Sequence, residues 1–209
     1  MASEKSGFYY PNKMVYIYLT AIEEMIGTEA MQAVLKTANL AQFINNYPPN
    51  NMGREFDFTD FSAIGTALEK LYGPRGERGL GTHAGKASFN QGVAEFGSLG
   101  GLGELAAKTL SPQAKIKVGL RAMAEAFSKF SDQQTSVTET DSHFIYTIRR
   151  CPVCWGRSST RSVCYIATSL IQEGLCWMNN GQKFDVEEVA CCATGAEACV
   201  FQIKKEPLK

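Results

Sequence analysis

The residues in this chain best suited to chemistry are its cysteines, all of which lie in the last third. They are Cys151, Cys154, Cys164, Cys176, Cys191, Cys192 and Cys199. The N-terminal residues contain no apolar segment typical of a secretory signal. An odd, clustered set of cysteines in such a chain argues against a disulfide framework. We therefore expect metal or thiol chemistry in this region.

The most distinctive pattern is Glu188 and Cys191, spaced as Glu-x-x-Cys, followed by Cys199. Glu188 belongs to one expected strand and Cys199 opens the next, so a hairpin would bring them together. Cys164, at the start of the preceding helix, reaches the same point if that helix packs on the sheet. Three thiolates and one carboxylate form a closed tetrahedral set, which is typical of structural zinc. The alternative is that some of these cysteines are simply buried and free.

A second pattern is the C-x-x-C knuckle formed by Cys151 and Cys154. This spacing allows two thiolates to bind one ion or to form a redox pair. The knuckle could therefore replace Cys164 in the zinc site, form a second site, or act in redox chemistry. Arginines such as Arg157 flank it and would favour the thiolate form or bind an anionic group. We expect Cys176, like Cys192, to be an ordinary free cysteine.

The elements that position these groups change in kind along the chain. Apolar residues recur with helical spacing after Pro11, after Thr28 and again from Phe61 to Leu71, and the third helix is expected to end at Gly73. Another helix begins at Ser111 and Pro112. From about residue 132 the pattern favours strands, at 136–150, 184–190 and 199–203, with a helix inserted at 164–177. This order predicts an α+β fold with an antiparallel sheet.

We treat residues 1–209 as a single domain, with a mainly helical part at 1–131 and strands carrying the metal-binding motif at 132–209. The net charge is zero, which gives no reason to expect nucleic acid as a partner. No apolar run approaches the roughly 20 residues of a membrane span. A cytoplasmic protein is therefore expected.

The segment 73–103 is rich in glycine and is expected to be a flexible loop, a lid over a pocket or a close helix contact, with a helix at about 84–96. Residues 101–106 fit G-x-G-x-x-A, but no strand precedes them, so a nucleotide site is not favoured. His83 lies in this segment and is the better histidine candidate for a metal or tetrapyrrole ligand. His143, at the start of a strand, is expected to be structural.

The C-terminal third resembles the vinyl-4-reductase domain family. The matching residues are CYIATSLIQEGL, from Cys164, and FDVEEVACCATGAEACVFQI, from Phe184. Members end in a similar helix, a strand leading to Glu-x-x-Cys, a glycine-containing turn and a final strand that begins with cysteine. The resemblance implies an antiparallel sheet packed with helices around an apolar pocket. In relatives that sense aromatic compounds, it also implies zinc at the positions of Cys164, Glu188, Cys191 and Cys199.

Other relatives take part in bacteriochlorophyll biosynthesis or, more distantly, are subunits of a Golgi tethering complex. The first hypothesis is that this chain binds or delivers a hydrophobic small molecule, with a bacteriochlorophyll-pathway tetrapyrrole as one candidate, and carries a structural zinc site. The alternative is a vinyl reductase or thiol redox protein that uses Cys151 and Cys154. A further alternative is a protein-interaction module. A homodimer is expected.

Overall fold

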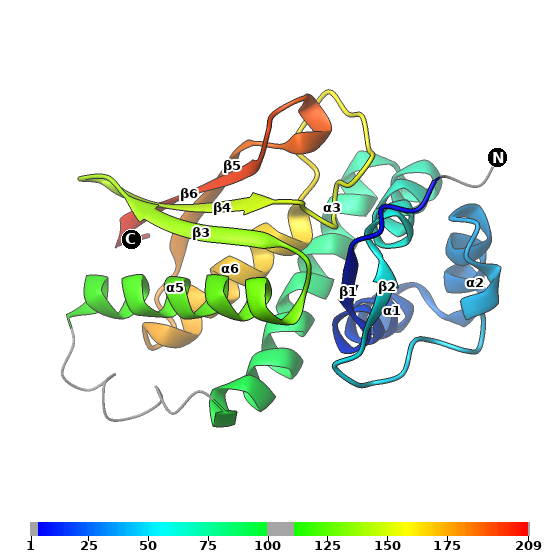
Figure 1. The fold of residues 1–209 in the computed structure, drawn as a ribbon, viewed down its shortest axis with the longest axis horizontal. Coiled ribbons are helices and arrows are strands. Elements are labelled where there is room, and N and C mark those ends of the chain that lie inside the picture. The colour runs from blue at the N-terminus through cyan, green and yellow to red at the C-terminus, as the bar shows by residue number, and fades with distance from the viewer. Residues whose placement is uncertain (1–3, 100–110, 209) are drawn as a thin grey trace.

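The fold joins a helical N-terminal part to a C-terminal sheet covered by helices (Figure 1). The computed structural model describes residues 4–99 and 111–208, with residues 93–99 described by their backbone alone. The predicted α+β class is confirmed. No helix within these described residues is long and apolar enough to cross a membrane.

The N-terminal part contains four helical segments and a two-stranded sheet that the sequence pattern had not indicated. Its elements are β1 (Tyr9–Pro11), α1 (Asn12–Ile26), α2 (Thr28–Thr37), η1 (Ala41–Phe43), β2 (Arg54–Asp57) and α3 (Phe58–Leu99). The apolar faces predicted for α1 and α2 are buried, except for Met25 near the end of α1, which is 53% exposed. Thr28 is the first residue of α2, and Gly27 occupies the capping position without a side-chain hydrogen bond.

The C-terminal part is a four-stranded antiparallel sheet in the order β3-β4-β6-β5. Its elements are α5 (Pro112–Phe130), β3 (Gln134–Glu139), β4 (His143–Arg149), α6 (Tyr165–Met178), β5 (Phe184–Ala190), η2 (Cys192–Thr194) and β6 (Cys199–Pro207). Ser111 caps α5 as predicted, with its Oγ accepting from the amide of Ala114 at 3.3 Å. Helices α5 and α6 cover one face of the sheet, and α3 runs between the sheet and the N-terminal elements (Figure 1).

The helix expected at about 84–96 is confirmed as part of α3, whereas residues 74–83, for which no helix was expected, also belong to α3. Gly73 interrupts the helix at φ 70°, and the helix resumes at Pro74, a residue well suited to a first turn. His83 therefore lies in a helix instead of a loop. The G-x-G-x-x-A pattern at 101–106 lies outside the described residues.

Gly85 lets α3 approach α6 closely. A Cβ atom at Gly85 would lie 2.4 Å from the carbonyl oxygen of Ile166 and 2.8 Å from Cβ of Ser169. Neither neighbour can yield without moving the backbone of α6. A close helix contact was one of the expectations for this segment, and the structure shows that the partner is α6.

Gly85→Ala is expected to lower the free energy of unfolding by about 1–3 kcal/mol, since the added methyl group forces the two helices apart. Gly79→Ala is the matched control, because a Cβ there meets nothing within 4 Å. That change should stabilise the protein by up to about 1 kcal/mol through helix propensity. Urea unfolding of both variants measures the difference, and equal effects would contradict the close contact.

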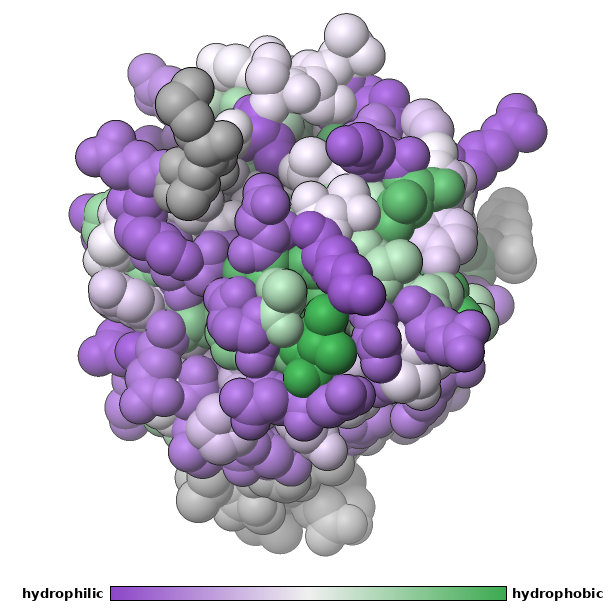
Figure 2. Space-filling view, turned by 90° about the vertical axis from the view of Figure 1, so that its right-hand side faces the viewer, coloured by the Kyte–Doolittle hydropathy of each residue, from purple (hydrophilic) through white to green (hydrophobic). Residues whose placement is uncertain are grey.

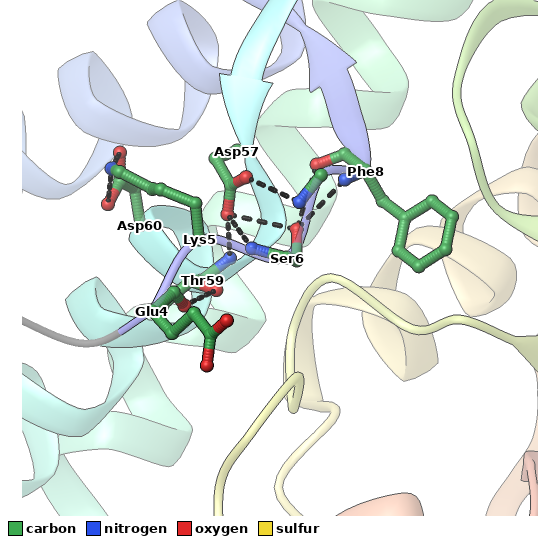
Figure 3. Close-up of polar contacts among 8 residues, drawn as sticks. Glu4, Lys5, Ser6, Phe8, Asp57, Thr59 and Asp60 are labelled. Atoms are coloured by element: carbon green, nitrogen blue, oxygen red, sulfur yellow. Dashed lines mark hydrogen bonds and ion pairs between the residues drawn. The ribbon is translucent and has the colours of Figure 1, made fainter.

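Asp57 holds the N-terminal segment against the start of α3 (Figure 3). Its carboxylate accepts from Ser6 N at 3.1 Å, Ser6 Oγ at 2.9 Å, Gly7 N at 3.1 Å and Thr59 N at 2.8 Å. Burial alone would raise the pKa of Asp57, but these hydrogen bonds outweigh it and hold the pKa below its usual value. The charged form therefore contributes to the stability of the fold.

Asp57→Asn is expected to cost about 1–2 kcal/mol at neutral pH, because the hydrogen bonds lose their charge assistance. A carboxyl group with a lowered pKa stabilises the fold above its unfolded pKa and loses that contribution as the pH falls through its folded pKa. The difference in free energy of unfolding between the variant and the native protein should thus be constant above about pH 5. It should shrink below pH 3.8, the ordinary pKa of this group. Urea unfolding at pH 7, 5 and 3 measures it; a constant difference would contradict this assignment.

Candidate metal centre

Five cysteines and one glutamate converge at the end of the sheet where β4 and β5 finish and β6 begins. Their ligand atoms form two overlapping groups of four, and within each group all atoms lie within 4.8 Å of one another. We name these groups the glutamate set, which is Cys164, Glu188, Cys191 and Cys199, and the knuckle set, which is Cys151, Cys154, Cys164 and Cys199. All five cysteines are buried.

The hairpin β5–β6 positions three of the ligands. Glu188 lies opposite Phe201 in the ladder, and a register shift follows between Glu188 and Ala190. Cys191 comes directly after β5, and the turn through η2 closes at Gly195 in the left-handed conformation, φ 93°. The chain then returns to Cys199 at the first position of β6.

The N-terminal end of α6 supplies one of the two ligands that both sets share. Cys164 occupies its N-cap position, and the backbone N–H of Cys164 donates to Glu188 Oε2 at 3.0 Å. The positive end of the helix dipole therefore faces the group of anionic ligands, which favours the thiolate and carboxylate forms.

The glutamate set has the dimensions of a zinc site. The Cys164 sulfur lies 3.8 Å from that of Cys191 and 3.6 Å from that of Cys199. Zinc–thiolate bonds of about 2.3 Å in a tetrahedron separate the sulfurs by about 3.8 Å. Oxygen Oε1 of Glu188 is buried without a hydrogen-bond partner among the described residues, as expected of an oxygen that binds a cation.

The electrostatics of Glu188 also favour a cation at this point. Burial, followed by the charge of Cys191, raises the pKa of Glu188 to about 8. Burial likewise raises the pKa of the Cys164 thiol. A bound divalent cation reverses both effects, because it neutralises the anionic forms that burial disfavours. The donor set of three sulfurs and one oxygen suits zinc better than magnesium or calcium.

The knuckle set depends on the pairing of β4 with β6. Ile148 lies opposite Cys199 in that ladder, so the chain leaving β4 passes close to Cys199. Arg150 adopts φ 54°, a conformation uncommon for a residue with a side chain, and turns the chain into the knuckle. The Cys151 sulfur then lies 3.6 Å from that of Cys164, and the Cys154 sulfur lies 3.3 Å from that of Cys199.

Arg150 and Arg157, two of the arginines near the knuckle, contact groups other than its cysteines. Arg150 lies over the ring of Phe8, at 4.5 Å from its centroid. Arg157 is buried and pairs through Nη1 with Glu77 at 2.7 Å and through Nη2 with Glu69 at 2.9 Å. The sequence pattern missed this ion pair, since Glu77 lies 80 residues away on α3.

The remaining candidates lie outside the two sets. Cys176 is half-buried in α6, and Cys192 is half-buried beside the site, with its backbone N–H donating to the Cys199 sulfur at 3.4 Å. His143 begins β4, as expected, and its Nδ1 contacts Ser142 Oγ at 2.8 Å. None of these side chains belongs to the two sets found among the described residues.

A small cavity of about 10 Å³ lies between the helical part and the chain that follows β4. Its walls include Tyr18 and Phe61 from the helical part, Tyr165 from α6, and the buried pair of Glu77 and Arg157. Its volume suits about one water molecule. The cavity thus combines aromatic walls with one charged pair.

Comparison with known proteins gives a family match for residues 144–205 and a likeness of the overall fold. The model of the vinyl-4-reductase domain family matches residues 144–205, which confirms the resemblance drawn from the motif. No curated protein matches the chain. Among solved structures, an H-NOX protein from S. oneidensis in the Fe(II)NO ligation state is 13% identical, with 96% of this chain and 100% of that chain covered at a TM-score of 0.60.

A second H-NOX structure, an isoleucine-to-phenylalanine mutant from T. tengcongensis, is 12% identical, with 96% of this chain and 100% of that chain covered at a TM-score of 0.63. At such low identity the likeness concerns the fold alone. It shows that the helical part and the sheet together form a known arrangement that spans nearly the whole chain.

Proposed function

Because residues 144–205 of this chain match the vinyl-4-reductase domain family, we propose that the protein binds a hydrophobic small molecule and carries a structural zinc ion in the glutamate set. The observation that supports binding is the cavity at the junction between the helical part and the segment that matches the family. A ligand there would contact both parts at once, so its binding would be coupled to their relative position.

Aromatic walls and one charged pair favour a small aromatic compound with a polar group. Tyr18, Phe61 and Tyr165 would contact the ring, while Arg157 and Glu77 offer a donor and an acceptor. Ligand pockets combine apolar walls with a few polar groups in this way. The cavity is smaller than such a compound in the present conformation, so entry requires the walls to move.

A tetrapyrrole does not fit this cavity. Some of the similar H-NOX structures were determined to probe heme distortion. Pockets for ligands of drug size measure about 300–1,000 Å³, whereas the cavity here is about 10 Å³. Neither His83 nor His143 lines it, so no histidine is placed there as an axial ligand. At this cavity a tetrapyrrole of the bacteriochlorophyll pathway is therefore less favoured than a small aromatic compound, while a wider hollow of about 420 Å³, lined by residues that include Tyr16 and Leu35, lies elsewhere in the helical part.

The redox alternative is weakened by the position of the knuckle. Cys151 and Cys154 are each 1% exposed, so neither sulfur is accessible to a substrate or to a partner thiol. For the interaction module, the face seen in Figure 2 is mostly hydrophilic with a small apolar patch. A patch of this kind is usual on soluble proteins and does not indicate a docking surface.

Calorimetric titration with substituted phenols, other aromatic compounds and hemin tests the binding function. We expect at least one small aromatic compound to bind at micromolar concentration and hemin to bind no more tightly than to an unrelated protein. Phe61→Trp, which fills the cavity, should weaken binding by at least about tenfold. Tyr72→Trp, at an exposed position, is the control.

Light scattering during size-exclusion chromatography of the same protein tests the homodimer.

If no aromatic compound binds at millimolar concentration, the binding function is wrong. Zinc content is measured separately, so the proposed metal site and the proposed ligand site are tested independently.

A further inference from the structure

The cysteine cluster contains more ligands than one zinc ion can use. Five sulfurs and one carboxylate lie together, while a tetrahedral ion takes four ligands. The glutamate set leaves out Cys151 and Cys154, and the knuckle set leaves out Glu188 and Cys191. Cys164 and Cys199 belong to both sets. The two surplus sulfurs, of Cys151 and Cys154, therefore complete a second set of four together with the shared pair.

We propose that the protein binds two zinc ions, one in each set, with the thiolates of Cys164 and Cys199 bridging them. This inference rests on the zinc site of the proposed function and extends it with a second metal position. The ion in the knuckle set is held by sulfur alone.

The sulfur positions carry this inference. Cys164 and Cys199, the shared edge, are 3.6 Å apart. The knuckle set adds separations of 3.6 Å for Cys151–Cys164 and 3.3 Å for Cys154–Cys199. These values lie near the roughly 3.8 Å edge expected around one zinc ion. The knuckle set thus matches the dimensions of a site to about the same degree as the glutamate set.

Charge balance is compatible with two ions if Cys151 and Cys154 are thiolates, whereas as neutral thiols they add no charge to a one-zinc site. Adding the thiolates of Cys151 and Cys154 to a one-zinc site would bury two further negative charges. A second Zn²⁺ cancels these two charges and leaves the net charge of the cluster unchanged. Two neighbouring cations are engaged elsewhere, because Arg150 lies over Phe8 and Arg157 pairs with Glu77.

Local structure assists the bridging role of Cys199. Its sulfur accepts from the backbone N–H of Cys192 at 3.4 Å, which offsets part of the thiolate charge. The sulfur of Cys164 lies at the N-terminus of α6, where the helix dipole favours negative charge. A bridging thiolate is further stabilised because it is shared by two cations.

Zinc analysis of the full chain, purified without added chelator, tests the proposal. The native protein should contain two zinc ions per chain. Cys151→Ser combined with Cys154→Ser should contain one, and Cys191→Ser combined with Glu188→Gln should also contain one. The control Cys176→Ser, outside both sets, should keep two.

A spectroscopic measurement on the native protein remains informative if a variant fails to fold. After exchange with ¹¹³Cd²⁺, the native protein should give two ¹¹³Cd resonances. The resonance further downfield belongs to the all-sulfur knuckle set, since thiolates deshield cadmium more than a carboxylate does. The knuckle variant should lose that resonance alone.

Each other outcome overturns the proposal in a recognisable way. One zinc ion in the native protein that survives loss of Cys151 and Cys154 leaves the glutamate set correct and removes the second position. One ion that disappears with Cys151 and Cys154 places the metal in the knuckle set and contradicts the proposed zinc site as well. Iron with acid-labile sulfide, or no metal at all, contradicts both.

Discussion

Cys191→Ser is expected to lose the zinc ion proposed for the glutamate set and to unfold at a temperature on the order of 10 °C lower than the native protein. Cys191 is fully buried and belongs to this set only, so its loss leaves the ion with three of its four ligands. Structural zinc contributes free energy directly to folding, because the site does not exist in the unfolded chain.

The reason for the large effect is what this ion would connect. Cys164 precedes α6, Glu188 lies near the end of β5 with Cys191 just after it, and Cys199 begins β6. Without the ion, the buried carboxylate of Glu188 keeps the amide of Cys164 as a partner for Oε2, while Oε1 has none among the described residues. The last helix and the last hairpin would then be held together mainly by packing.

Differential scanning fluorimetry with parallel zinc analysis provides the measurement. Cys176→Ser is the matched control, since Cys176 is a half-buried cysteine on α6 outside the site, and it should change the free energy of unfolding by less than about 0.5 kcal/mol. Equal melting temperatures for Cys191→Ser and Cys176→Ser would show that no structural metal depends on Cys191.

Arg157→Met is expected to lower the free energy of unfolding by about 3–5 kcal/mol. The side chain of Arg157 is 6% exposed and that of Glu77 is 4% exposed, with 2.7 Å between their charged atoms. Removing the arginine leaves a buried carboxylate on α3 without its partner, which costs far more than loss of a surface pair. This pair also connects α3 to the segment that follows the knuckle.

The pH dependence of this variant follows from the pKa of Glu77. Burial raises that pKa, although the bond to Arg157 opposes the shift. Without Arg157 the pKa of Glu77 rises further. A carboxyl group with a raised folded pKa destabilises the fold as the pH rises from its unfolded pKa through its folded pKa. Destabilisation by Arg157→Met should therefore be smaller at pH 5 than at pH 8.

Two further variants separate this effect from loss of packing. Arg157→Met combined with Glu77→Leu removes both charges and should recover much of the lost stability. Lys204→Met breaks the exposed pair with Asp185 and should cost less than about 1 kcal/mol. Urea unfolding compares all three; a double variant no more stable than Arg157→Met would show that packing dominates.

The sequence alone determined the features that depend on neighbouring residues. The α+β class, the cap of α5 at Ser111 and the β5–β6 hairpin all follow from the spacing of apolar residues, caps and turn residues. The grouping of Glu188, Cys191 and Cys199 is local in the same sense, since one hairpin joins them. These inferences need no information about distant parts of the chain.

Only the tertiary structure decided the features that depend on distant contacts. The knuckle meets Cys164 and Cys199 because β4 pairs with β6, and strand order is not encoded in the period of either strand. Residues 74–83 extend the helix expected at about 84–96, and only the fold shows that Gly85 packs against Ile166 and Ser169 of α6. The sequence also could not predict the partner of Arg157, because Glu77 comes near it only when α3 packs beside the segment after β4. The spacing of apolar residues indicates which face of a helix or strand is buried. It does not indicate which other element covers that face.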